Sequence, residues 1–65
     1  MNDYYLSEFL PGIYVINEDK KDIWGIGQIQ SSINGTITIN FENVGKKTIN
    51  INKVKLKKID INGTD

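Results

Sequence analysis

The stretch that decides the fold reads DIWGIGQI, residues 22–29, and is followed after a short gap by TITINF, residues 36–41. Gly25 and Gly27 are separated by one residue in a run that otherwise favours β-structure. A glycine inside a strand is destabilising unless it marks a bulge, a sharp bend or the close approach of another backbone. A very small sheet needs bent strands in order to curl around a core. The stretch therefore indicates a small, strongly curved sheet.

Alternation of apolar and polar residues with a period of two runs through most of the chain. The pair Asn34 and Gly35 is the strongest short hairpin signal, because both residues tolerate the positive φ of a type I′ turn. A second tight connection is expected over residues 42–45, with Gly45 in the left-handed conformation. The expected strands span residues 12–17, 24–31, 36–41, 47–51 and 54–59.

Such short connections leave no room for parallel crossovers, so the sheet must be antiparallel. The alternation places Ile37, Ile39 and Phe41 inside, together with Ile49. We therefore expect an all-β domain, a five-stranded, strongly bent and partly open barrel of the SH3 type.

The first ten residues are a lead-in to this barrel, which we expect over residues 11–60. Asp3 can cap a helical turn that ends before Pro11, and an extended lead-in is the alternative. In the helical case Leu6, Phe9 and Leu10 cover an open end of the barrel. Residues 61–65 are expected to fray as a tail.

Composition excludes several classes of function. The 65 residues suffice for one domain, and most apolar side chains are needed for its small core. There is no cysteine and no histidine, which excludes disulfides, Cys/His zinc sites, haem attachment, and a Cys or His catalyst. The serines have no histidine partner. The sequence therefore predicts a non-enzymatic protein without a cofactor or metal.

Charge and hydropathy favour a soluble protein of the cytoplasm. No charged-then-apolar leader is visible, and the longest apolar run covers only residues 13–16. The net charge is zero, but residues 1–32 carry −3 and residues 33–65 carry +3. Every cation is a lysine, which counts against sequence-specific DNA reading because arginine is preferred for guanine and phosphate.

Four segments, residues 11–15, 24–31, 37–47 and 49–50, together resemble a small bacterial domain family of unknown function. That family is similar to the Tudor-like module at the C-terminus of UvrD/PcrA helicases. It is more distantly similar to the RNA-polymerase-interacting domains of CarD and Mfd. The resemblance covers residues 10–59. It implies the SH3/Tudor-like fold and a partner in transcription or repair, namely RNA polymerase or a repair factor.

The interaction surface that we expect lies on the outward positions of the first two strands. Exposed aromatic side chains anchor protein interfaces. For Trp24 the alternative is packing across the bend, over Gly25 and Gly27. Docking by strand addition at an open barrel edge is the expected mode. The predicted interaction residues are Tyr14, Trp24, Ile26 and Gln28.

Lysines of the C-terminal half suggest an alternative function in nucleic-acid binding. Several of them alternate along the expected last strand, where they also serve to protect a sheet edge from aggregation. We expect a monomer or a weak dimer, the latter through pairing of barrel edges. The candidate nucleic-acid contacts are Lys46, Lys47, Lys53, Lys55, Lys57 and Lys58.

Overall fold

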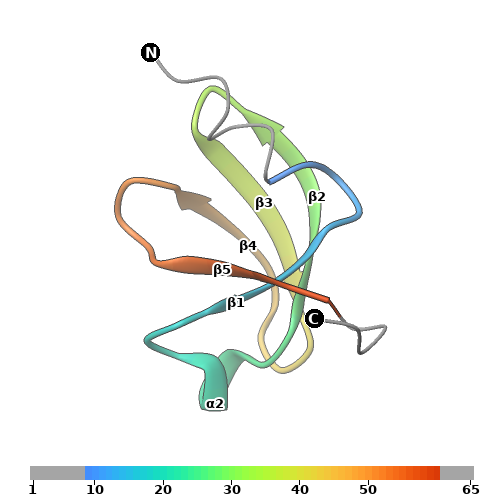
Figure 1. Ribbon diagram of the computed structural model, residues 1–65, viewed down its shortest axis with the longest axis vertical. Helices are drawn as coiled ribbons and strands as arrows, with labels where there is room; N and C mark the ends of the chain where they lie inside the picture. Colours follow the sequence, from blue (N-terminus) through green and yellow to red (C-terminus); the bar gives the residue numbers. More distant parts are fainter. Residues whose placement is uncertain (1–8, 61–65) are drawn as a thin grey trace.

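The computed structural model describes residues 9–60, which form one antiparallel sheet and a single helical turn (Figure 1). The strand order is β4-β3-β2-β1-β5, and all neighbours are antiparallel. This confirms the predicted all-β class with five antiparallel strands. The elements are β1 Tyr14–Asn17, α2 Lys21–Trp24, β2 Gly27–Ile33, β3 Thr36–Phe41, β4 Gly45–Asn50 and β5 Leu56–Ile59.

The sheet is not closed into a barrel, which corrects the expected architecture. β4 and β5 are the two edge strands, and within residues 9–60 no strand pairing joins them. The connection between them carries Ile51 and Val54, which pack on the core. Side-chain packing, rather than a fifth ladder, therefore covers this side of the molecule.

The β2–β3 hairpin turns at Asn34 and Gly35, as predicted, with φ of 51° and 82°. Its ladder contains a bulge, because Ile29 pairs with Ile39 whereas Ser31 pairs with Thr38. Gln30 is thus an extra residue. A bulge bends its strand and strengthens the twist. It also reverses the alternation, so that Ile33 lies on the outer face.

Two further predictions concern the turn after β3 and the bounds of the strands. The tight turn after β3 is confirmed, with Gly45 at φ 79°. β3 has the bounds expected for it, but β5 begins at Leu56 rather than at residue 54. As a result, Lys53 and Lys55 lie in the preceding loop and do not belong to an alternating stripe on the last strand.

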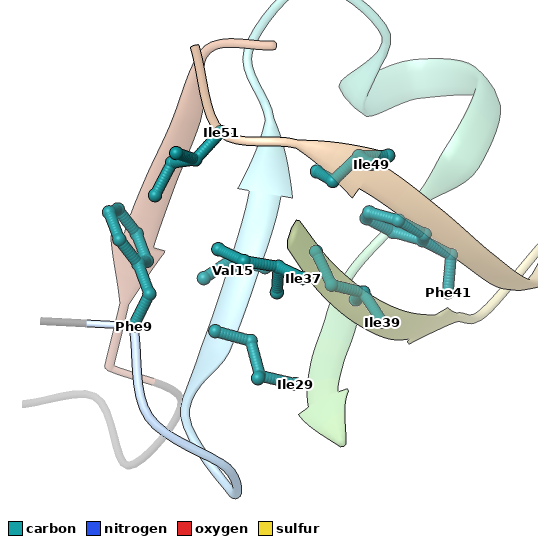
Figure 2. Close-up of a cluster of buried hydrophobic side chains, with 8 residues drawn as sticks. All are labelled: Phe9, Val15, Ile29, Ile37, Ile39, Phe41, Ile49 and Ile51. Carbon is teal, nitrogen blue, oxygen red and sulfur yellow. The ribbon is translucent and has the colours of Figure 1, made fainter. Parts of the chain in front are cut away.

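The core lies on the concave side of the sheet and is made of aliphatic side chains and two phenylalanines (Figure 2). Val15, Ile37 and Ile39 are completely buried. The inward positions predicted for β3 and for Ile49 are confirmed. The cluster consists of Phe9, Val15, Ile29, Ile37, Ile39, Phe41, Ile49 and Ile51.

The N-terminal segment contributes to this core through Phe9, which is buried at the same end of the cluster as Ile51 (Figure 2). Leu10 is 49% exposed and does not share this role. Leu6 and the expected helical turn before Phe9 lie outside the described residues, as does the tail of residues 61–65.

Candidate functional site

The four predicted interaction residues separate into two groups. Tyr14, Ile26 and Gln28 line one groove on the outer face of the sheet. Trp24 does not line this groove. Its ring packs edge-on against Phe41, with centroids 5.0 Å apart, and it is half-buried against the core. The expected outward position of Trp24 is therefore wrong. The ring packs inward on Phe41 and the core, whereas the alternative had placed it over Gly25 and Gly27.

Trp24 leaves the outer face because it is the last residue of α2, whereas a strand was expected to begin at this residue. The carbonyl of Lys20 accepts hydrogen bonds from the N–H groups of Ile23 and Trp24, at 2.9 and 2.8 Å. Gly25 then ends the turn at φ 78° and ψ −164°, a conformation that is essentially restricted to glycine. The strand alternation starts only after this break.

The segment after α2 is attached to the β3–β4 turn by three hydrogen bonds. The N–H of Ile26 donates to Oε1 of Glu42 at 3.0 Å, and the N–H of Glu42 donates to the carbonyl of Ile26 at 2.8 Å. The N–H of Asn43 donates to the carbonyl of Trp24 at 3.0 Å. These bonds place the β3–β4 turn beside the first residues of β2 and form one end of the groove.

The strand register places five side chains in one line across the outer face. We call this line the outer-face row. Tyr14 of β1 is opposite both Gln28 of β2 and Ile59 of β5. Asn40 of β3 is opposite both Gln28 and Lys46 of β4. Directly opposite residues of an antiparallel pair point to the same face. The row therefore reads Ile59, Tyr14, Gln28, Asn40, Lys46.

The outer-face groove overlies the middle of this row. It holds about 550 Å³, is open to solvent, and is lined by residues 14, 26–28, 40–43 and 45. The amide of Gln28 donates to the carbonyl of Gly12 at 3.3 Å, which fixes that side chain. Within residues 9–60, neither the Tyr14 hydroxyl nor the Asn40 amide has a hydrogen-bond partner. Both groups are available to a molecule that lies in the groove.

The six lysines considered for nucleic-acid contact are not brought together. The ammonium of Lys47 lies 5.1 Å from the centre of the Trp24 ring, on the inner side of the sheet. Lys53 and Lys55 line a second groove together with Glu18 and Asp19, whose charges oppose theirs. This leaves Lys46, Lys57 and Lys58, which are exposed on the two edge strands.

Two features are absent from the described part of the chain, a metal-binding group and a membrane-spanning helix. Residues 9–60 contain no group of three or more His, Cys, Asp or Glu side chains able to hold a metal ion. Among the same residues no helix has the length and apolar character needed to cross a bilayer.

A protein-family model matches residues 9–59, and the family is described as "Protein of unknown function (DUF3553)". The matched region includes the glycine-containing bend and the turn at Gly45. The chain belongs to this family. Comparisons of the chain with curated proteins and with solved structures give no match. The DUF3553 match covers every strand and all residues of the outer-face row, so the groove is part of the family domain.

Asn40 and Asn43 are groove residues that the predicted site did not include. Asn40 was expected to point outward, but only the strand register shows that it lies beside Gln28. Asn43 reaches the groove through the contact between the β3–β4 turn and α2, for which the sequence carries no signal.

Proposed function

We propose that this domain is a non-enzymatic protein-interaction module that binds its partner on the outer-face groove. The observation that carries the proposal is that Tyr14 of β1, Gln28 of β2 and Ile26, which directly precedes β2, line one open depression. An aromatic ring, an apolar side chain and amides with free hydrogen-bonding capacity are the mixture that anchors protein interfaces. The groove is too open to enclose a small molecule, which favours a macromolecular partner.

The resemblance to the Tudor-like helicase module and to the CarD and Mfd domains supports a partner class. On this basis the partner is RNA polymerase or a DNA-repair protein of the cytoplasm. The linear strand order leaves the edges of β4 and β5 unpaired within the described residues, so strand addition is a second means of attachment.

The nucleic-acid alternative has less support. Of its six lysines, Lys47 is placed over Trp24, and Lys53 and Lys55 lie beside two acids. Zero net charge provides no long-range attraction for phosphates. The protein-interaction proposal does not require these lysines to form one continuous basic surface.

The test is capture of partners from a lysate of the source cells with the immobilised chain and two variants. Tyr14→Ala removes the ring from the groove, whereas Ile33→Ala removes a 64% exposed side chain from the same face outside the groove. We expect Tyr14→Ala to lose the proteins that the parent and Ile33→Ala retain, with polymerase or repair proteins among them. Trp24 fluorescence verifies that both variants are folded. Identical captured proteins for all three chains would refute the proposal.

A further inference from the structure

The charge inside the outer-face groove points to the chemistry of the partner. Among the described residues that line this groove, Glu42 is the one with a charge. It directly follows β3, and its N–H donates to the carbonyl of Ile26 at 2.8 Å, which places the two residues opposite each other. Asn40 lies two positions before Glu42 and lines the same groove.

The carboxylate of Glu42 is held in place by the bend of the chain beside it. Its Oε1 accepts the N–H of Ile26 at 3.0 Å. A Cβ on Gly25 would lie 2.7 Å from the same oxygen, so the carboxylate lies close against the glycine backbone. No lysine of residues 9–60 forms an ion pair with Glu42. The groove therefore contains one fixed negative charge, with its second oxygen available to a cation.

The polar groups beside this charge provide further hydrogen-bond acceptors. The amide nitrogen of Gln28 donates to the carbonyl of Gly12, which leaves the amide oxygen of Gln28 for a ligand. The amide of Asn40 and the hydroxyl of Tyr14 have no partner in the described chain. Arginine has five N–H donors and no acceptor, and its planar guanidinium stacks on aromatic rings. It is the side chain that best matches a carboxylate, amide oxygens and a tyrosine.

We propose that the partner protein places an arginine side chain in the outer-face groove. The guanidinium donates to the carboxylate of Glu42 and to the amide oxygen of Asn40, and its flat face packs on the ring of Tyr14. Asn40 and Glu42 are two positions apart, about 7 Å at roughly 3.4 Å per residue, so one guanidinium spans both oxygens. This inference rests on the proposed function and specifies the residue that the module recognises.

Charge argues against two other occupants of the groove. An acidic segment or a phosphate backbone would bring negative charge to Glu42, and unlike charges across an interface are what selects a partner. Lys46 pairs with Asn40 from β4 but does not line the groove, so it does not neutralise this site. A lysine of the partner supplies the charge, but as a compact ammonium it does not stack on a ring or bond in a planar fork.

The experiment is selection of a phage-displayed library of random twelve-residue peptides on the immobilised full chain. The test variant is Glu42→Gln, which keeps an oxygen for the N–H of Ile26 and removes the charge. The matched control is Glu18→Gln, which removes the same charge at the second groove. We expect the parent and the control to enrich peptides that contain arginine, and Glu42→Gln not to enrich them.

Two synthetic copies of an enriched peptide then test which groups pair. One keeps the arginine and the other has citrulline, which is nearly the same shape but neutral. The parent should bind the citrulline copy about fivefold more weakly, because an exposed ion pair contributes up to ~1 kcal/mol. Glu42→Gln should bind the two copies equally, since the charge on the peptide has lost its partner.

Each other outcome is decisive. Enriched peptides without arginine, whose binding is lost in Tyr14→Ala, would overturn the arginine and leave the interaction module intact. The same preference for arginine over citrulline in Glu42→Gln as in the parent would also overturn it. Weaker binding of the enriched peptides to Lys46→Gln would indicate an acidic contact and overturn the cationic ligand. Absence of any enrichment would overturn both proposals.

Discussion

Gly25 and Gly27 are required for two different structural reasons. At Gly27 the backbone is in ordinary strand geometry, and the absence of a Cβ leaves room for core side chains. At Gly25 the backbone itself takes a conformation that other residues avoid. The sequence pattern predicted a bend at these glycines, but it did not distinguish the two roles.

Substitution Gly27→Ala should destabilise the fold by overpacking. A Cβ at this position would lie 2.5 Å from Cγ2 of Ile39 and 2.6 Å from Cδ1 of Phe41. Overpacking of this kind typically costs about 1–3 kcal/mol. Urea unfolding followed by Trp24 fluorescence measures the loss. Gly35→Asn is the control, since asparagine tolerates positive φ, and its effect should stay within about 0.5 kcal/mol. A smaller loss for Gly27→Ala than for this control would contradict the packing.

At the scale of elements, the parts of the chain with strict alternation were predictable. β3 and the two turns around it match the expectation because an inward apolar side chain every second residue permits one register. The single turn of α2 was missed because its charged residues suit a loop as well as a helix. Hydrogen bonds to the β3–β4 turn favour the helical turn, and the sequence does not show these bonds. Alternation predicted that Tyr14, Ile26 and Gln28 face outward, although it failed for Trp24. The place of Asn40 in the groove required the register between strands, and that of Asn43 required the contact between α2 and the β3–β4 turn.

The contact between α2 and the β3–β4 turn can be tested at Glu42. Removal of its carboxylate in Glu42→Ala leaves the N–H of Ile26 without its partner at 3.0 Å. A loss of about 0.5–1.5 kcal/mol is expected for an intramolecular hydrogen bond, measured by urea unfolding. Glu42→Gln retains a carbonyl oxygen and should keep most of the stability. If the two variants lose the same amount, the hydrogen bond is not the cause.

At the scale of the whole molecule, the single sheet of residues 9–60 has two unequal parts that meet at a short junction between β1 and β2. β2, β3 and β4 are joined by two ladders of six residue pairs each. β1 and β5 share four pairs, but β1 pairs with β2 at only two positions, Tyr14–Gln28 and Val15–Gly27. Two further backbone bonds, from Gly12 to Ile29 and from Ile29 to Ile13, extend this junction. The barrel that the pattern suggested is not closed, because the edge strands β4 and β5 do not pair with each other within residues 9–60.

This division predicts the order in which the amides exchange with deuterated water. Amides of β3, paired on both sides along its whole length, should be the slowest, with protection close to the global free energy of unfolding. Amides of β5, a four-residue edge strand, should exchange faster by a partial opening in which β5 detaches first. Exchange measured by NMR at neutral pH checks this order. Equal protection of β3 and β5 would show that the sheet opens as one unit.

The bulge at Gln30 has a consequence for comparing relatives of this domain. Before it, even-numbered positions of β2 face outward, and after it odd-numbered positions do, so Ser31 and Ile33 take the side that Gln28 occupies. A homologous chain that lacks this one residue would keep the amino acids that correspond to Ser31 and Ile33 on the outer face, but only a gap placed at Gln30 aligns them correctly. An alignment that ignores the insertion would assign solvent-facing residues to the interior and transfer a binding surface to the wrong side of the molecule.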